Sequence, residues 1–490
     1  MSNIVSLGKE TLIYGLSYSL GRVINFLLIT SYLTYRVFEK EDGFFSIYQD
    51  LYFYIGLFLG ILTLRMETVY FRFVSDPQYK ELIYPLASRL IWIVSGLFLI
   101  IIITFRSPIL DWMKYGPSLS LHLLMACSIL VLDVIVSLPF AKIRYDKKPI
   151  RYAWIKLTGL LMNVILVLGI FEGIKFWLES GSLSELSSER KLLYVLMANL
   201  LASFLTTLLL FPEILQAIKK VDWSPLKKMF SYTWPLIVVT LSFTIIQSGY
   251  TSYLKYLLSD DVKANLMATD SLNAAFRLAV IMNLFLTAFN YAAEPFFFRH
   301  ASNTNAKQHF ADLSYVFILC CSVIYLVTCL NLNLFSLLLG TNYRASMHLV
   351  PVLLMGNIFS GLYYNLSAWN KLTDKTLMAA GISFSGLVLN TVLYILLIPM
   401  LGLDASAWIL LVVYFWMCAW SYFQGQKHYP IPYQLIPMFL NLSFVALIAW
   451  IFQNYNFGSQ TISLVLGNLI CFIFIFYTYR MIRKSINQSQ

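Results

Sequence analysis

The sequence predicts an all-α polytopic membrane protein with about 14 transmembrane helices. These are expected to form two repeated lobes of about six helices each, followed by two C-terminal helices. Composition is the first reason: 59% of the 490 residues are hydrophobic, 12% are charged, and the mean hydropathy is +0.71. Soluble domains carry about 25% charged residues. Most of the chain is therefore expected to lie in a lipid bilayer.

Long apolar runs, separated by short polar breaks, are the second reason. Each run has the roughly 20 residues that a spanning helix needs. The runs begin near Thr11, Gly43, Leu82, Leu119, Arg151, Lys191, Lys228, Asn265, Gln308, Met347, Thr376, Leu403, Tyr433 and Gln460. The first run is about 23 residues long and lacks a small-residue cleavage site, so we interpret it as a retained span rather than a signal peptide.

Lysine and arginine are distributed unevenly between the two sides of the predicted bundle. With the N-terminus inside, about 21 of these cations fall in cytoplasmic segments and about 10 in the opposite loops. The bias is strongest in the segment Lys142–Arg151. Both termini are therefore predicted to be cytoplasmic. The net charge of +11 lies mainly in these loops, so we expect no nucleic-acid partner.

Two pairs of similar motifs indicate an internal repeat. SYLTY at 31–35 matches SYLKY at 252–256, and ETVYFR at 67–72 matches EPFFFR at 294–299. The matching helices are an even number of spans apart, which predicts parallel repeats with a substrate site between the lobes near the membrane midplane.

The repeat predicts the domain boundaries. We expect an N-terminal lobe at residues 1–220 and a C-terminal lobe at 221–428. The last two spans, at 429–490, fall outside the repeat.

Arg22 and Arg277 lie in the middle of apolar spans, where a lipid-facing arginine costs about 2.5–3.5 kcal/mol on insertion scales. Each shares a helix stripe with an asparagine, and two further arginines lie near the inner side of their spans. Arginine suits phosphate because its planar fork donates paired hydrogen bonds. We therefore predict a hydrophilic cavity that binds an anionic group. Its candidate binding residues are Arg22, Asn25, Arg65, Arg89, Asn273 and Arg277.

A second set of ionisable residues is predicted to form gates or to couple transport to an ion. It consists of Asp50, Glu67, Arg72, Asp133, Asp270, Glu294 and Arg299. Glu67 with Arg72, and Glu294 with Arg299, are expected either as ion pairs at helix ends or as an inner gate. The alternative for the embedded arginines is that acids in the spans neutralise them and hold helices together.

Motifs for catalysis and cofactors are missing from the sequence. The six cysteines lie in apolar runs without metal-ligand spacing, and the five histidines are scattered. No Walker A pattern is present, which argues against ATP-driven pumping. We expect no enzyme activity, no metal and no cofactor, while the coupling ion, Na⁺ or H⁺, stays open.

Four segments carry a resemblance to a known family. They are KETLIYGLSYSLGRVINFLL at 9–28, RMETVYFRF at 65–73, YAAEPFFFRHA at 291–301 and GLYYNLSAWNKLTDKT at 361–376. The chain resembles, over essentially its whole length, the bacterial oligosaccharide flippases of the multidrug/oligosaccharidyl-lipid/polysaccharide exporter superfamily. The last three segments are typical of the branch for lipopolysaccharide and polysaccharide biosynthesis.

The resemblance implies a flippase in the bacterial inner membrane. Its substrate would be an undecaprenyl-pyrophosphate-linked oligosaccharide, the repeat unit of an O-antigen, capsule or exopolysaccharide, moved from the cytoplasmic to the periplasmic leaflet. The resemblance also implies two six-helix lobes in a V around a cationic cavity, with Arg22 and Arg277 at positions where such flippases carry cavity arginines. A polysaccharide polymerase and glycosyltransferases are candidate partners, and we expect a monomer.

Two other functions stay open. A cation-coupled multidrug exporter would use the same scaffold, but span 1 lacks the acid that this branch tends to carry. The acids Asp50, Asp133 and Asp270 nevertheless keep ion coupling open. A glycosyltransferase or ligase of the same pathway would need a sizeable outer domain, and the longest soluble stretch, Glu172–Arg190, is too short for one.

Overall fold

The computed structural model describes most of the chain. The described residues are 21, 23–38, 42–74, 76–177, 186–219, 221–300, 306–373, 375–455 and 459–489. Their regular structure is entirely helical, and 13 of their helices are long and apolar enough to cross a membrane. A shorter apolar helix, Val23–Val37, overlaps the predicted first span. The all-α polytopic fold with about 14 helices is thereby confirmed.

The chain divides into two compact units, which we describe separately. Unit 1 comprises Met1–Tyr256 and Asp260–Met267, and unit 2 comprises Leu257–Ser259 and Ala268–Gln490. These units are defined by packing, whereas the lobes predicted above are defined by a sequence repeat. The repeat boundary at residue 221 therefore stays a prediction.

The first part of unit 1 contains one broken span. The helices of this first part are η1 (Leu28–Val37), α2 (Phe44–Leu62), α3 (Met66–Phe73), α4 (Ile83–Thr104) and α5 (Arg106–Trp112). Gly43, at φ +85°, precedes α2, and a side chain there would press on Leu266. Two consecutive non-glycine residues, Leu64 and Arg65, have left-handed φ angles of 48° and 53° and separate α2 from α3. This conformation is strained for L-residues, so the break is a defined feature of the span.

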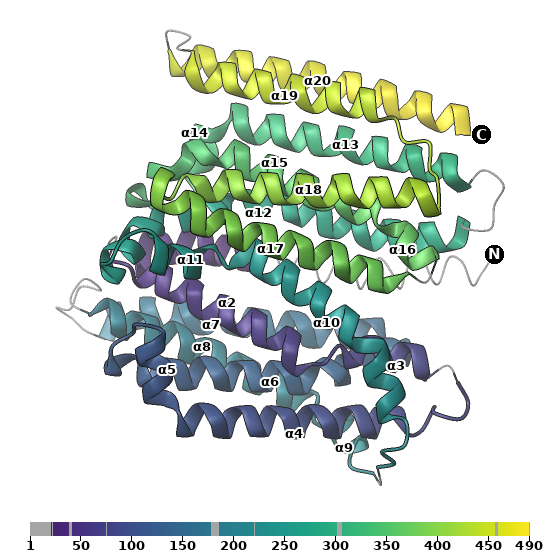
Figure 1. Ribbon diagram of the computed structural model, residues 1–490. Coiled ribbons are helices and arrows are strands. Elements are labelled where there is room, and N and C mark those ends of the chain that lie inside the picture. The colour runs from purple at the N-terminus through teal and green to yellow at the C-terminus, as the bar shows by residue number, and fades with distance from the viewer. Residues whose placement is uncertain are drawn as a thin grey trace. The chain divides into compact units, whose positions relative to one another are not determined.

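The rest of unit 1 surrounds α6. A short turn, η2 (Pro117–Leu119), leads into α6 (Ser120–Tyr145), and α7 (Pro149–Trp177), α8 (Ser188–Leu209) and α9 (Phe211–Gln216) follow. Helix α6 packs against both α4 and α8, and α8 also packs against α7 (Figure 1). We call the end where α6 leads into α7 the basic end of unit 1, and the opposite end the α5 end.

Two further helices complete the description of unit 1. They are α10 (Leu226–Ser248) and α11 (Tyr250–Leu257). Helix α10 packs against both α2 and α3. An added Cβ at Gly60 would lie 3.2 Å from Thr240 Cγ2, so the α2 and α10 backbones approach closely at this point.

Unit 2 contains most of the remaining helices. Helix α12 (Val262–His300) enters it from unit 1 and is followed by α13 (Ala306–Leu330), α14 (Leu332–Ser336), η4 (Thr341–Tyr343), η5 (Ala345–Leu349), α15 (Val350–Leu366), α16 (Ala368–Leu372), α17 (Thr376–Leu401) and α18 (Ala405–His428). Helix α18 packs against α15 and α17, and α13 packs against α15. Gly402, at φ +70°, ends α17.

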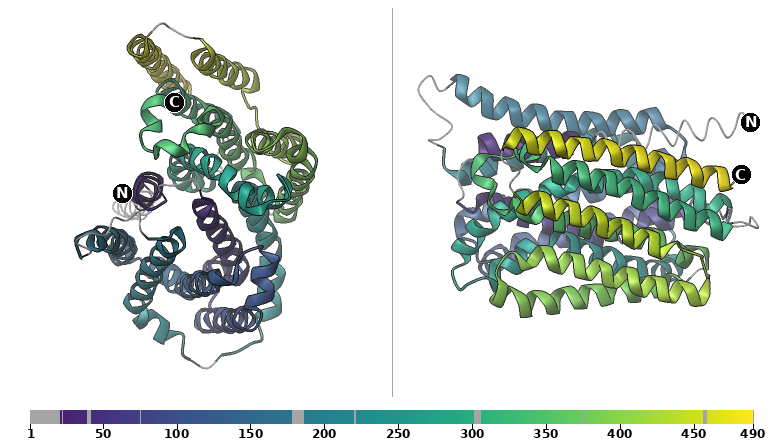
Figure 2. Two further views of the ribbon diagram at one scale, coloured as in Figure 1. Left: turned by 90° about the vertical axis from the view of Figure 1, so that its left-hand side faces the viewer. Right: turned by 90° about the horizontal axis from the view of Figure 1, so that it is seen from above.

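The last two spans, α19 (Leu435–Asn454) and α20 (Gln460–Ser489), both pack on α13, at one side of unit 2 (Figure 2). Asn331 and Asn468 donate hydrogen bonds to each other at 3.3 and 3.2 Å and tie α20 to the end of α13. Large apolar side chains of α17 and α19 remain outside, including Met400 and Ile436 at 79% and 76% exposure. Such a surface is suited to lipid contact.

Candidate functional site

The candidate binding residues of unit 1 have different environments. Arg22 lies outside the described residues, while Asn25 is exposed on the first helix. Arg65 is also exposed, and it stands at the break between α2 and α3, where it precedes the N-terminus of α3. Arg89 is half-buried on α4, about 9 Å along the helix from its first residue.

Arg89 retains unused hydrogen-bonding capacity. Its Nε is buried and has no hydrogen-bond partner among the described residues. The guanidinium carbon lies 5.8 Å from the centre of the Trp92 ring. A buried donor without an acceptor is costly, so this arginine is suited to receive an anionic oxygen.

Glu67 does not pair with Arg72 as expected. Its carboxylate forms an ion pair with Arg144 of α6, while the Arg72 guanidinium lies 4.3 Å from the centre of the Tyr232 ring of α10. Residues five apart on a helix are about 140° apart around its axis, so Glu67 and Arg72 point to different neighbours. Glu67 thus connects α3 to α6, and Arg72 connects α3 to α10.

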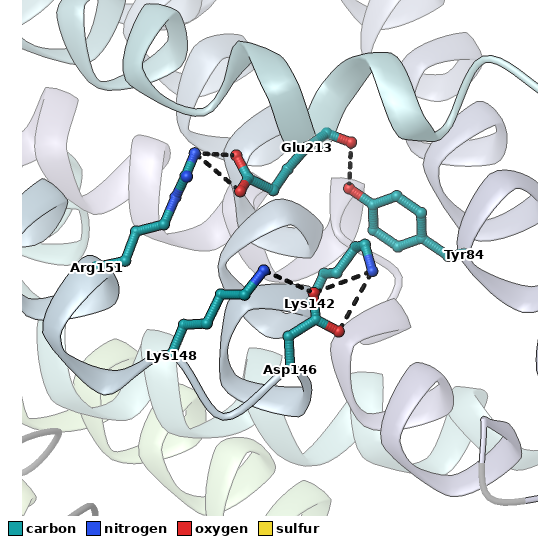
Figure 3. Close-up of polar contacts among 6 residues, drawn as sticks. All are labelled: Tyr84, Lys142, Asp146, Lys148, Arg151 and Glu213. Atoms are coloured by element: carbon teal, nitrogen blue, oxygen red, sulfur yellow. Dashed lines mark hydrogen bonds and ion pairs between the residues drawn. The ribbon is translucent and has the colours of Figure 1, made fainter.

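A second ion pair at the basic end joins α7 to α9. Arg151 lies 2.9 and 3.0 Å from the two carboxylate oxygens of Glu213 (Figure 3). Glu213 is buried, and its backbone oxygen accepts a hydrogen bond of 2.8 Å from the Tyr84 hydroxyl of α4. This contact holds three helix ends together.

A neighbouring cluster surrounds Asp146 in the same view (Figure 3). Its carboxylate lies 3.2 Å from Lys142 Nζ and 3.8 Å from Lys148 Nζ. With Lys147 beside them, these lysines outnumber the acid. The basic end therefore retains positive charge after local pairing, which suits contact with an anionic headgroup.

Asp133 lies deeper in unit 1, half-buried on α6. It accepts a hydrogen bond of 3.0 Å from Ser203 Oγ of α8 and interacts electrostatically with Lys156 of α7. Lys156 is exposed, its Nζ lies 4.2 Å from the centre of the Phe140 ring, and its charge also interacts with Glu67. Lys156 was not among the residues predicted from the sequence, although a lysine within an apolar span was the available signal.

Asp50 is fully buried near the α5 end, in an ion pair with Lys255, which was not among the residues predicted from the sequence. Its Oδ2 lies 2.7 Å from Lys255 Nζ of α11, and neither side chain has any exposed surface. The carboxylate also accepts hydrogen bonds from the hydroxyls of Tyr115 and Ser252. Asp50 is thus satisfied within unit 1 by three donors, which leaves no need for an embedded arginine as its partner.

The candidate residues of unit 2 lie on α12. Asp270 and Asn273 are fully buried, and Arg277 is half-buried. Their spacing places them on one side of the helix. The same helix is joined to α15 by a hydrogen bond of 3.1 Å from Asn357 Nδ2 to the Ala279 oxygen. For Glu294 and Arg299 the structure describes only the helical backbone of α12, so their side-chain roles stay predictions.

These features define a class. The chain is a multi-pass helical membrane protein that buries ionisable side chains within its spans, an arrangement typical of transporters.

Comparisons with known proteins agree with this class. The fold is similar to that of the lipid II flippase MurJ in an inward closed conformation, with a TM-score of 0.70, 12% identity, and coverage of 96% of this chain and 99% of that one. It is also similar to an inward-facing multidrug resistance MATE transporter of the MOP superfamily, with a TM-score of 0.61, 12% identity and coverage of 86% and 97%. The Vibrio cholerae MATE transporter VcmN, in its bent form, gives a TM-score of 0.57 at 13% identity over 91% and 99%. The predicted fold of the exporter superfamily is thereby confirmed. No family model and no curated sequence matches the chain.

Proposed function

We propose that this protein is a flippase that moves an undecaprenyl-pyrophosphate-linked oligosaccharide from the cytoplasmic to the periplasmic leaflet by alternating access. The supporting observation is the set of cations embedded in the spans. In unit 1, Arg89 has a buried donor without an acceptor, and Lys156 is exposed within a spanning helix. In unit 2, Arg277 is half-buried on α12.

A pyrophosphate headgroup matches these cations chemically. It carries negative charge that must stay paired away from bulk water, and guanidinium groups supply charge-assisted hydrogen bonds to phosphate. The excess of lysine around Asp146 would attract such a lipid to the basic end. That end is proposed to be cytoplasmic, with both termini on the same side in a bacterial inner membrane.

A cation-coupled multidrug exporter is the second candidate. Asp133, bonded to Ser203 inside unit 1, supports it because an embedded carboxylate is suited to binding a proton, Na⁺ or a cationic drug. Neither candidate is an enzyme. The flippase proposal includes two lobes, at residues 1–220 and 221–428. It also includes a monomeric state and, as partners, a polysaccharide polymerase and glycosyltransferases.

Proteoliposomes distinguish the two functions. Purified protein is reconstituted and tested for movement of a fluorescent polyprenyl-pyrophosphate-linked saccharide and, separately, of ethidium. A flippase moves the lipid and not ethidium, and the opposite result establishes the exporter. Movement of neither molecule argues against both.

Variants then test the binding residues. We expect Arg22→Ala and Arg277→Ala to lower lipid movement at least about tenfold, since each removes a charge-assisted contact. Lysine at either position should restore activity partly, because it supplies charge without the planar fork. Arg480→Ala, an exposed arginine of α20, is the matched control and should leave movement unchanged. Wild-type movement in both alanine variants, at equal protein levels, would contradict the site.

A further inference from the structure

One face of α2 meets α10 through small residues. Gly56 and Gly60 on α2 lie opposite Thr244 and Thr240 on α10, and an added Cβ at Gly56 would lie 3.8 Å from Thr244 Cγ2. Both threonine hydroxyls donate to carbonyls of their own helix, at 2.8 and 2.9 Å, so their methyl groups are available for packing. This small-residue contact, together with the Asp50–Lys255 pair beyond it, is called the seam.

Among the described residues, the Asp50–Lys255 pair is the only ion pair of the seam, and it lies at the α5 end. Besides Asp50, the Lys255 ammonium is surrounded by aromatic rings, with Nζ 4.5 Å from the centre of Tyr115, 4.9 Å from Tyr256 and 5.8 Å from Tyr54. The pair therefore fastens α11 to α2 and to the segment after α5. At the other end of α10, Tyr232 contacts Arg72 and Phe73.

A permanent helix contact does not need such a pair. Replacing a buried ion pair by apolar residues of similar size is often neutral or stabilising, and the best-attested roles of buried pairs are in specificity and switching. An ion pair near a bundle end also has a property that an apolar contact lacks. When the helices part, water hydrates both charges. This hydration offsets much of the lost attraction between them, so the free-energy difference between the closed and open forms is small. The small-residue contact between α2 and α10 would lose only van der Waals contacts on opening, and lipid or water would replace them.

The predicted repeat adds a reason for movement. SYLKY, which contains Ser252 and Lys255, belongs by sequence to the C-terminal lobe, yet α10 and most of α11 pack in unit 1. Rocking of one lobe against the other, which is part of the proposed function, would separate α10–α11 from the N-terminal lobe.

We propose that the seam is a gate of the transport cycle, with the Asp50–Lys255 ion pair as its latch. In the closed form the pair is desolvated and the small residues interlock. In the open form α11 leaves α2, the two charges become hydrated, and the α5 end is open to water.

A reversible crosslink tests whether the seam must open. Gly60→Cys with Thr240→Cys places two thiols where an added Cβ and a Cγ are 3.2 Å apart, within reach of a disulfide. The matched control is Gly159→Cys with Thr206→Cys, which joins α7 to α8 and has a Cβ–Cβ distance of 3.6 Å. Both pairs are made in a chain whose native cysteines are replaced by alanine or serine.

Oxidation should lower transport at least about tenfold in the seam variant and reductant should restore it, whereas the control should keep its activity in both states. Transport by the oxidised, fully crosslinked seam variant would overturn the proposal. If the seam variant is inactive when reduced, Gly56→Cys with Thr244→Cys replaces it, because the 3.8 Å spacing there demands less adjustment.

A second measurement needs no substrate. Thr251→Cys replaces a buried side chain of α11 and should react slowly with a bulky thiol reagent in nanodiscs, while Asp260→Cys, at an exposed site, reacts fast. The seam crosslink should abolish the slow labelling and leave the fast labelling intact. Slow labelling that persists at the same rate in the crosslinked protein would overturn the gate. If the wild type moves neither test molecule, the proposed function fails, and the labelling still decides the gate.

Discussion

The two partners of the Asp50–Lys255 pair should be strongly coupled in their effect on stability. Both side chains are fully buried, with Nζ and Oδ2 2.7 Å apart. Loss of one partner from a buried pair typically costs about 3–5 kcal/mol, because the remaining charge is left without compensation. Lys255→Met should show this cost, although Asp50 keeps the hydroxyl donors of Tyr115 and Ser252.

Asp50→Leu should be the more damaging single change. It leaves the ammonium without a carboxylate and also removes the acceptor of the Tyr115 hydroxyl, an orphaned donor that adds about 1–3 kcal/mol, while the Ser252 hydroxyl can still donate to Tyr54 Oη at 3.4 Å. In the double variant Asp50→Leu/Lys255→Met no buried charge remains and only the hydroxyl cost persists. Each single variant therefore carries an unpaired-charge cost of about 3–5 kcal/mol that the double variant lacks, so the coupling free energy of the cycle is expected to be at least about 6 kcal/mol.

The assay is chemical unfolding of the four proteins in one mixed micelle, followed by tryptophan fluorescence. A matched cycle with Lys142→Met and Asp146→Leu removes a partly exposed pair at 3.2 Å and should give a coupling below about 1 kcal/mol. Single effects at Asp50 and Lys255 that add within about 0.5 kcal/mol would refute the reasoning. So would a Lys255→Met variant less stable than Asp50→Leu.

Two further outcomes are expected. Gly361→Ala should lower the free energy of unfolding by about 1–3 kcal/mol, because its Cβ would lie 2.5 Å from a leucine of α12 and 2.6 Å from Phe317. The control is Gly381→Ala, which has open space around the added Cβ and should be neutral or slightly stabilising. Equal melting temperatures for these two variants would contradict the packing. In intact cells, a single cysteine at Ser182 should react with an impermeant thiol reagent and one at Ser302 should not; the reverse labelling would invert the predicted orientation.

Local features of the sequence predicted the spans well. The runs expected to begin near Lys228, Thr376 and Leu403 correspond to helices that begin at Leu226, Thr376 and Ala405. Helices were predictable because a backbone in lipid must satisfy its own hydrogen bonds, so a long apolar run is almost obliged to be helical. The break at Leu64 and Arg65 was not predictable, since neither residue favours a left-handed conformation.

The candidate site was predicted less completely. Embedded arginines were visible as charges in apolar runs, and Arg89 was predicted because it lies near the inner side of its span. Lys156 and Lys255 are also charged residues in or near apolar runs, but neither was predicted as a site residue. Lys156 lies within a span, and Lys255 is part of the repeated motif SYLKY. Helical geometry alone argues against the Glu67–Arg72 pair, and the structure pairs Glu67 with Arg144 instead.

The sequence by itself determined that this protein is a multi-pass helical membrane protein, because hydropathy and chain length act locally and leave one structural solution in lipid. Tertiary structure decided which charges meet. Asp50 pairs with Lys255, 205 residues away in the sequence, and Glu67 pairs with Arg144, 77 residues away. These pairings depend on which helices become neighbours and on how each is rotated about its axis, and both are set by packing of the whole unit rather than by any one segment.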